Sequence, residues 1–392
     1  MDEERLKRTR AAMASEGLDA LILRLPENVL LLSGYWPLTG RSFLLFPREG
    51  KAVCIVPGIH EKEAAKELWE AELIVIPFGR ITSGDYFAQL GRALKDAVSR
   101  RGLRRIGFEG SFETFAPPWD VAEPAIPAAP TGEVLADVAG SAELVDATDF
   151  LYRLRATKTP SELARLRIVN EIAAMGLLAF ADAAREGMSG VRLVSLVEST
   201  IMNEGTGYKG ATRVRGFAQV STGEAETLDG YRLMLVSTAR RIAAGDLAML
   251  ELAVVADGFW CDRTRVRVAG NPSSKQAAAF DAIMRAQAAA AKALRAGVTA
   301  GSVDSAAREV IGAAGFGDGF FHSTGHGLGF RYHEPIPVVE PGVTTILEAG
   351  MVVTIEPGIY LPGLGGLRME DDFLVTEAGS ECLGPAESRF AS

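Results

Sequence analysis

Three of the four histidines in this chain lie close together near its C-terminal end. They are His322, His326 and His333, whereas His60 lies alone far upstream and is interpreted as a surface or packing residue. Imidazole is the commonest metal ligand and the side chain that carries protons near neutral pH. This concentration in a histidine-poor chain predicts a metal centre or an acid–base site in the C-terminal region.

Four carboxylates accompany the histidines. Glu251 is the only polar residue in the run Leu247–Ala256, Glu356 ends a second apolar run, and Asp262 and Glu370 lie on the segments that follow. A buried carboxylate is costly unless it is paired or bound to metal. For one such acid a buried salt bridge explains the pattern, and Arg368 is the alternative cation for Glu251. Four acids with a histidine favour metal.

The chemical types of these ligand atoms indicate which metal ion the site would bind. Four carboxylates and one imidazole form a hard, oxygen-rich site, which suits Mn²⁺, or Co²⁺ and Zn²⁺, better than a thiolate-seeking ion. Bridging carboxylates suit two ions about 3.5–4 Å apart.

The two acidic runs form a weak internal repeat. Glu251 lies six residues after Gly245, and Glu356 lies six residues after Gly350. Each run precedes a return segment that carries a further acid. We therefore expect two similar halves, each placing two carboxylates on a hairpin, to converge on one centre.

Other common catalytic motifs are absent. The sequence contains no His-Glu-x-x-His motif, no phosphate-binding Gly-rich loop and no Gly-x-Ser-x-Gly elbow. Cys261 adjoins Asp262 in a strand, so it points to the opposite face and is interpreted as a core residue. The three cysteines are far apart and form no Cys-x-x-Cys pair, which favours a reducing, cytoplasmic environment.

The composition of the chain limits the classes of binding partner that we expect. Hydrophobic residues make up 48% of the 392 residues, which predicts a globular protein of two or three domains. The net charge of -9 and the absence of a long basic run argue against a nucleic-acid partner. The charged N-terminus lacks the apolar core of a signal peptide, and no apolar stretch reaches the roughly 18 residues of a membrane span.

The elements that must position these residues follow from periodicity. A helix is expected over Asp2–Glu16, followed by alternating strands and a helix, which indicates an α/β domain. The expected strands are Ala20–Leu23, Val29–Leu32, Ser42–Phe46, Ala52–Val56, Leu73–Ile76 and Arg105–Phe108, and the helix is Tyr86–Ser99. Residues 115–133, rich in Pro and Ala, are expected to form a long loop or an irregular helix.

A second domain is expected to begin with a strong helix start. Thr159 is suited to the N-cap, Pro160 to the first helical position, and Glu162 completes a capping box. A long helix should run from there to about Glu186. We place the boundary just before it, giving an accessory α/β domain at 1–152 and a catalytic domain at 153–392.

These motifs resemble those of the creatinase/prolidase/methionine aminopeptidase superfamily, whose catalytic domain has the pita-bread fold. The resemblance covers nearly all of residues 155–380, and the N-terminal part resembles the accessory domain of prolidases, aminopeptidases P and creatinases. The matching segments are Gly245–Arg265 with its Asp-Arg-Thr-Arg end, His322–Glu334, Thr354–Tyr360 and Arg368–Asp372.

The resemblance implies a metallopeptidase in which a metal-activated bridging water cleaves an Xaa-Pro bond in peptides or dipeptides. Asp262 and Glu370 would bridge two divalent ions, with Mn²⁺ preferred over Co²⁺ or Zn²⁺. His322 and His333 would contact the substrate and the tetrahedral intermediate, Glu356 would accept a proton, and Arg368 would orient the carboxylates. The full ligand set would be Glu251, Asp262, His326, Glu356 and Glu370. The resemblance also implies a homodimer.

The chain departs from the family pattern in three ways. The first ligand is normally Asp, whereas Glu251 is longer by one methylene. The peptidases carry a histidine about 17 residues upstream, near Met234, and no histidine lies between residues 61 and 321. Phe330 and Tyr332 are aromatic where the family is usually aliphatic. The metal site and the proton-transfer or substrate-anchoring group are therefore expected to differ.

Three functions follow from this pattern. The first is an Xaa-Pro peptidase with a modified two-metal site. The second is a C–N hydrolase on the same fold, like creatinase or ectoine hydrolase, which need not use metal. The third is a non-enzymatic peptide-binding relative, against which the presence of His326, Glu356 and Glu370 argues.

Overall fold

The computed structural model describes residues 1–37, 41–77, 86–110, 129–231, 237–385 and 390–391. These residues form two compact units, Met1–Arg155 and Ala156–Ser392, each with its own core. The boundary expected between residues 152 and 153 falls inside helix α6 (Thr148–Ala156). Among the helices of the described residues, none has the length and apolarity that a membrane span requires.

The first unit is built on a six-stranded mixed sheet in the order β4-β3-β2-β1-β5-β6. Strand β1 pairs in parallel with β5 and antiparallel with β2, so the sheet changes direction in its middle. The strands are β1 (Ala20–Leu23), β2 (Phe43–Pro47), β3 (Ala52–Pro57), β4 (Ala71–Ile76), β5 (Arg105–Phe108) and β6 (Glu143–Asp146). The helices are α1 (Glu3–Ser15), α2 (Pro26–Ser33), α3 (Glu61–Glu67), α4 (Tyr86–Ser99), α5 (Ala129–Ala139) and α6.

One expected strand of this unit is wrong. Val29–Leu32 lies in helix α2, which begins with Pro26 in its first turn and ends at Gly34 in the left-handed conformation. A short apolar run does not distinguish a buried strand from a buried helix, and the flanking Pro and Gly decide here. Of the segment 115–133, residues 115–128 lie outside the described residues, and the remainder belongs to α5.

The second unit begins with the expected helix, α7 (Pro160–Ala183). The capping box is confirmed: the Thr159 hydroxyl accepts from the Glu162 amide, and the Glu162 carboxylate accepts from the Thr159 amide. The further helices are α8 (Gly190–Gly205), α9 (Gly223–Leu228), α10 (Ser274–Ala293) and α11 (Ala300–Ala313).

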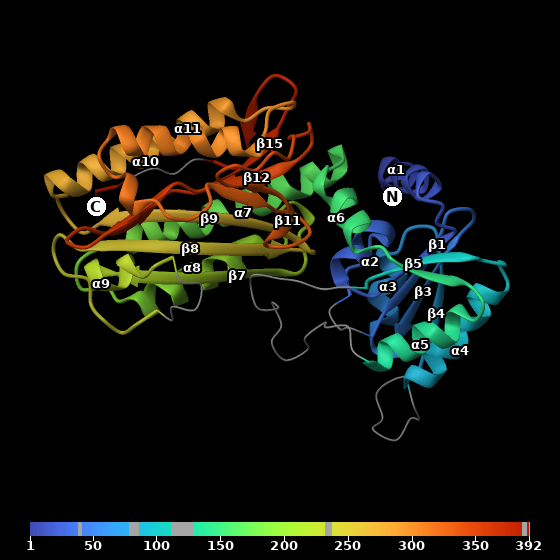
Figure 1. The fold of residues 1–392 in the computed structure, drawn as a ribbon. Helices are drawn as coiled ribbons and strands as arrows, with labels where there is room; N and C mark the ends of the chain where they lie inside the picture. Colours follow the sequence, from blue (N-terminus) through green and yellow to red (C-terminus); the bar gives the residue numbers. More distant parts are fainter. Residues whose placement is uncertain (38–40, 78–85, 111–128, 232–236, 386–389, 392) are drawn as a thin grey trace. The chain divides into compact units, whose positions relative to one another are not determined.

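Three antiparallel sheets complete the second unit, ordered β7-β8-β9, β11-β10-β12-β15-β16 and β13-β14. Helices α10 and α11 pack on each other and are drawn above strands β8 and β9 in Figure 1, with α8 drawn below. Helix α7 packs on β8 and β9, and α8 packs on β7. The strands are β7 (Val214–Thr222), β8 (Leu247–Ala256), β9 (Phe259–Val268), β10 (Gly325–Gly327), β11 (Glu334–Val339), β12 (Val352–Ile355), β13 (Gly358–Leu361), β14 (Gly365–Arg368), β15 (Asp371–Val375) and β16 (Ser380–Cys382).

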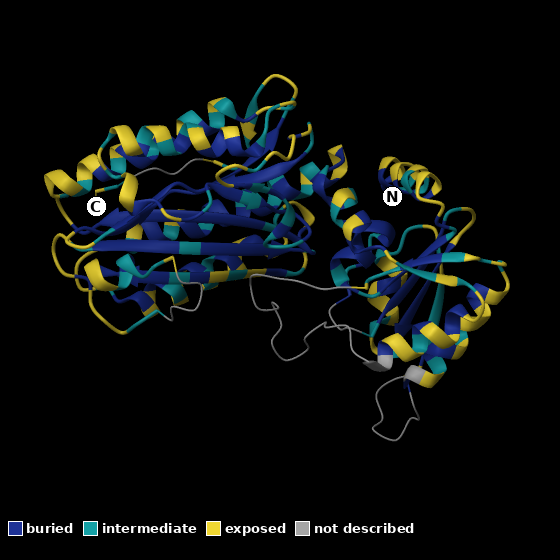
Figure 2. Ribbon diagram, viewed as in Figure 1, coloured by how far each residue is buried: buried dark blue, intermediate teal, exposed yellow. Residues whose placement is uncertain are grey.

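The halves of the second unit have similar parts. In each half, a pair of packed helices precedes a pair of antiparallel strands. In the first half the helices are α7 and α8 and the strands are β8 and β9. In the second half the helices are α10 and α11 and the strands are β12 and β15. Both strand pairs are buried along almost their whole length (Figure 2). The mixed α/β class is confirmed. The first acid-bearing hairpin is present as β8 and β9, whereas the second pair, β12 and β15, is interrupted by β13 and β14, so its acids Glu356 and Glu370 lie at strand ends and not on a hairpin.

The capping box yields a stability prediction. Thr159→Ala removes the hydroxyl that satisfies the Glu162 amide, so the free energy of unfolding should fall by about 1 kcal/mol. Thr159→Ser is the matched control, because it keeps the capping oxygen and loses only a methyl group. Urea unfolding measures both variants, and an equal loss in the two would assign the effect to packing instead of capping.

Candidate active site

Strands β8 and β9 carry the first pair of acids. Glu251 lies opposite Thr264 in the strand register, and it is the one position of β8 that is not fully buried. Asp262 is 1% exposed on β9. Its neighbour Cys261 faces the other way, where its thiol contacts the Val169 carbonyl, and burial raises its pKa well above the usual value. Cys261 is therefore a core residue, as expected.

His326 reaches this pair from β10. Its Nε2 lies 3.4 Å from Asp262 Oδ2 and 3.7 Å from Glu356 Oε1. Its Nδ1 lies 2.9 Å from the Gly327 carbonyl, which accepts only, so Nδ1 carries the proton. Burial lowers the pKa of His326 to about 4, which leaves Nε2 unprotonated at neutral pH. A bare nitrogen thus faces two carboxylates, an arrangement that a cation stabilises.

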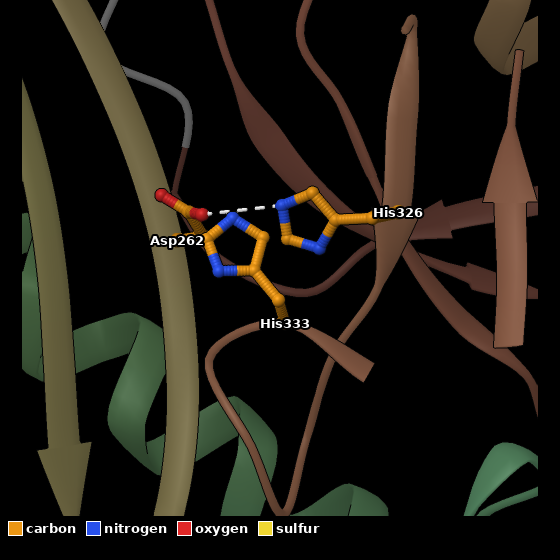
Figure 3. A group of neighbouring side chains, drawn as sticks. All are labelled: Asp262, His326 and His333. Carbon is orange, nitrogen blue, oxygen red and sulfur yellow. Dashed lines mark ion pairs between the residues drawn. The ribbon is translucent and has the colours of Figure 1, made fainter. Parts of the chain in front are cut away.

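His333 completes the group drawn in Figure 3. The side chains of Asp262, His326 and His333 converge from β9, from β10 and from the segment that leads into β11. The rings of His326 and His333 lie 4.2 Å apart between centroids. Burial and the nearby His326 lower the pKa of His333 well below its usual value, so both imidazoles are neutral at neutral pH.

The other two acids lie beside the second strand pair, β12 and β15. Glu356 follows β12, and its amide donates to the Thr324 carbonyl. Glu370 lies between β14 and β15, is 1% exposed, and its Oε1 has no hydrogen-bond partner among the described residues. Burial raises the pKa of Glu370 to about 7, although Arg368 opposes the shift. Burial and then the charge of Glu370 raise the pKa of Asp262 and of Glu356 well above their usual values.

These donors fit divalent metal. They form three groups in which the ligand atoms lie within 4.8 Å of one another. Asp262, His326 and Glu370 each belong to two groups, and of these three the two carboxylates have the two oxygens that bridging a pair of ions requires. The groups are Asp262, His326 and His333; His326, Glu356 and Glu370; and Glu251, Asp262 and Glu370. Arg368 is one cation beside these acids, at 3.8 Å from Glu370 and 3.9 Å from Glu356, and a metal ion would supply further positive charge to the crowded carboxylates and the bare imidazole nitrogen.

Arg368 is the cation beside Glu251. Its Nη2 forms an ion pair with Glu251 Oε2, its Nη1 donates to the Tyr360 hydroxyl at 2.7 Å, and its Nε donates to Thr264 Oγ1 at 3.0 Å. The arginine alternative for the charge of Glu251 is therefore present in the structure. Pairing alone thus explains the acid in β8, and Glu251 does not require a metal as its only partner.

Aromatic rings surround His322 on the other side of the site. His322 Nδ1 lies 2.8 Å from the Ser323 carbonyl, and its Nε2 has no partner among the described residues. Tyr231 stacks on this imidazole with ring centroids 4.6 Å apart, and the exposed Phe321 meets Tyr231 edge-on. The position near Met234 that corresponds to the family's upstream histidine lies outside the described residues.

Sequence reasoning assigned no role to three hydroxyl groups of the site. Tyr332 donates to Glu251 Oε1 at 2.6 Å and lies 3.3 Å from Asp262 Oδ1. The Thr264 hydroxyl lies 2.8 Å from Glu251 Oε2 and 2.7 Å from Glu370 Oε2. Tyr360 contacts Arg368. Only Tyr332 gave a signal, because it is aromatic at a usually aliphatic position.

Comparison with known proteins identifies the family. Residues 164–377 match the model of metallopeptidase family M24, which is more than half of the chain. The chain belongs to this family. Residues 5–157 of this metallopeptidase also match the creatinase/prolidase N-terminal domain.

Relatives match the chain over nearly its whole length. A protein of Pyrococcus furiosus named Xaa-Pro dipeptidase is 31% identical over 388 residues, which is 98% of this chain and 99% of the relative. The crystal structure of the prolidase from Pyrococcus horikoshii is 29% identical, with a TM-score of 0.76 over 98% of this chain and 99% of that one. The structure titled Xaa-Pro dipeptidase from Bacillus anthracis has a TM-score of 0.81 at 25% identity and covers both chains completely. These relatives support the pita-bread assignment.

Proposed function

We propose that this chain is an Xaa-Pro peptidase, which hydrolyses the bond between a residue and the proline that follows it. The observation that carries the proposal is the convergence of Asp262, Glu356 and Glu370 on His326, with His333 beside Asp262, in a chain that belongs to a metallopeptidase family. Relatives named Xaa-Pro dipeptidase align with both of its domains. These relatives favour the peptidase over a C–N hydrolase of the creatinase type.

The family implies divalent metal, and the donors of this chain fit it. We propose Mn²⁺ as the natural ion, because the donor set is mostly carboxylate oxygen with one imidazole. The resemblance to the superfamily implies two ions. Asp262, His326, Glu356 and Glu370 would hold one, and Glu251, Asp262 and Glu370 would contribute to the other. Bound metal supplies an acidified water and polarises the scissile carbonyl.

The side chains around this cluster would perform the proton and charge chemistry. Glu356 is suited to accept a proton, because burial and Glu370 raise its pKa and its Oε1 makes only long contacts, at 3.4 Å to the Thr354 hydroxyl and 3.7 Å to His326 Nε2. His333 and His322 would contact the substrate, His333 near the carbonyl where negative charge develops. Arg368 would hold Glu251 in place through its ion pair.

The aromatic group Tyr231, Phe321 and Tyr360 is suited to contact the substrate beside His322. Phe321 is 59% exposed and Tyr231 is 42% exposed, so apolar ring surface remains open next to a buried imidazole. A proline ring is a compact apolar surface that packs well on such faces. We propose that these rings face the prolyl residue.

The proposal also includes the cellular compartment and the oligomeric state of the enzyme. We place it in the cytoplasm, since its three cysteines form no disulfide, which fits a reducing compartment. We also propose a homodimer, on the resemblance to relatives with the same accessory domain. Light scattering at micromolar concentration tests this assembly, and a monomeric mass would contradict it.

A substrate panel tests the function. The purified chain with Mn²⁺ is expected to hydrolyse Xaa-Pro dipeptides and longer Xaa-Pro peptides, and to leave matched Xaa-Ala peptides largely uncleaved. Chelation should remove the activity and Mn²⁺ should restore it, which a metal-independent hydrolase would not show. Hydrolysis of creatine or ectoine without cleavage of any Xaa-Pro peptide would overturn the proposal.

A further inference from the structure

The two sides of the carboxylate cluster differ in the protein contacts that they already make. On the His326 side, His326 Nε2 faces carboxylate oxygens of Asp262 and Glu356 at 3.4 and 3.7 Å. Glu370, which borders both sides, has one oxygen without a hydrogen-bond partner among the described residues. On the Glu251 side both oxygens are engaged. Arg368 pairs with Oε2, and the Tyr332 hydroxyl donates to Oε1 at 2.6 Å. Arg368 lies farther from the acids of the first side, at 3.9 Å from Glu356 Oε2 and 3.8 Å from Glu370 Oε2, so the protein itself satisfies Glu251 more completely than the acids around His326.

The Tyr332 hydroxyl also reaches the second acid. It lies 3.3 Å from Asp262 Oδ1, so one phenol oxygen stands beside Glu251 and Asp262 together. An ion shared by these two acids would need both oxygens at about 2.0–2.2 Å. The hydroxyl therefore stands where it competes with such an ion for the lone pairs of Glu251 Oε1.

Local packing holds the hydroxyl at this place. The Tyr332 ring lies 4.3 Å from His333 and 6.1 Å from Trp260, measured between centroids. The Trp260 amide donates to the Gly329 carbonyl, and Gly329 has a φ of +144°, a conformation that residues with a side chain rarely adopt. The segment that carries Tyr332 is thereby fixed against β9, and the phenol cannot move aside without disturbing these contacts.

Given the proposed metal-dependent function, we propose that Tyr332 is the residue that sets metal affinity on the Glu251 side of the cluster. Its hydroxyl takes the place of a cation between Glu251 and Asp262, so an ion binds there only after that hydrogen bond has broken. The ion on the His326 side binds without this competition. Glu251 and Tyr332, which both depart from the family pattern, act as a matched pair.

The test measures Mn²⁺ binding by calorimetry on the full-length, metal-free chain, with no substrate present. Wild type is expected to bind one ion tightly and a second ion weakly. Tyr332→Phe keeps the ring and removes only the hydroxyl, so the second ion should bind about tenfold more tightly or better, because a hydrogen bond to a charged acceptor no longer opposes it. The first ion should bind as in wild type.

Tyr208→Phe is the matched control, because Tyr208 lies in the same unit outside the donor groups, and it should leave both affinities unchanged. Tyr332→Leu replaces the Phe variant if that variant unfolds early in a thermal melt. An unchanged or weaker second site in Tyr332→Phe, or two equal sites in wild type, would overturn the proposal. Because activity is not measured, a failure of the peptidase function does not alter the outcome.

Discussion

Replacing Glu370 by Gln is expected to remove metal binding and peptidase activity together. Glu370 belongs to both the donor group of His326 with Glu356 and the donor group of Glu251 with Asp262, so one substitution reaches both sides of the cluster. An amide is a much weaker ligand than a carboxylate and brings no negative charge. Since metal contributes several kcal/mol to such reactions, kcat/KM should fall on the order of 1,000-fold, with little bound Mn²⁺ in the dialysed protein.

Measuring the stability of the metal-free Glu370→Gln variant shows whether any loss of activity comes from a lost metal ligand or from a damaged fold. Burial raises the pKa of Glu370 from 4.5 to about 7, so the folded chain favours the protonated acid. Its contribution to stability is present below pH 4.5 and is lost as the pH rises through 7. Gln is neutral at every pH. At pH 8 the metal-free variant should therefore unfold no earlier than the metal-free wild type.

Glu340→Gln is the matched control, because Glu340 is an exposed glutamate of the same unit and should keep both metal and activity. A Glu370→Gln protein that is folded, retains its full Mn²⁺ content and hydrolyses Xaa-Pro peptides normally would contradict the role of Glu370 as a ligand.

Much of the framework could be predicted because local chemistry determines it. The capping box at Thr159 uses three neighbouring residues, and the run around Glu251 needs only its own apolar pattern to be identified as a buried strand. The grouping of the acids with His326 followed from the repeat and the family motifs. The strand predicted at Val29–Leu32 was wrong because helix and strand patterns coincide over four apolar residues, and the flanking Pro26 and Gly34 that separate them lie outside that run.

The residues that contact Glu251 could not be predicted from the local sequence pattern. Arg368 lies more than a hundred residues away in sequence, and its guanidinium reaches Glu251 because strand β14, which ends at Arg368, lies against β8. Tyr332 contacts Glu251 from 81 residues away in sequence. Such contacts depend on how distant segments meet, which periodicity within either segment does not determine. An acid in an apolar strand therefore predicts a positive partner, and the tertiary structure decides between metal and arginine.

A histidine in this site can either bind metal or donate a hydrogen bond to the substrate, and a substitution of His333 distinguishes these two roles. His333→Ala is expected to lower kcat about 100-fold while the bound Mn²⁺ stays at the wild-type level, because the loss removes a donor near the developing charge and not a ligand. The structure allows the other role as well, since His333 groups with Asp262 and His326 within ligand distance of one another (Figure 3). Metal content and rate must therefore be measured on the same samples.

The two roles give opposite results in this experiment. If His333 is a ligand, the Ala variant loses metal, and excess Mn²⁺ restores its rate. If it is a donor to the substrate, excess Mn²⁺ has no effect and kcat stays low, with a smaller change in KM, because the contact strengthens in the transition state. His60→Ala, in the other unit, should leave both quantities unchanged. We expect the donor result, because His326, Glu356, Glu370 and Asp262 already supply four ligands on that side without His333.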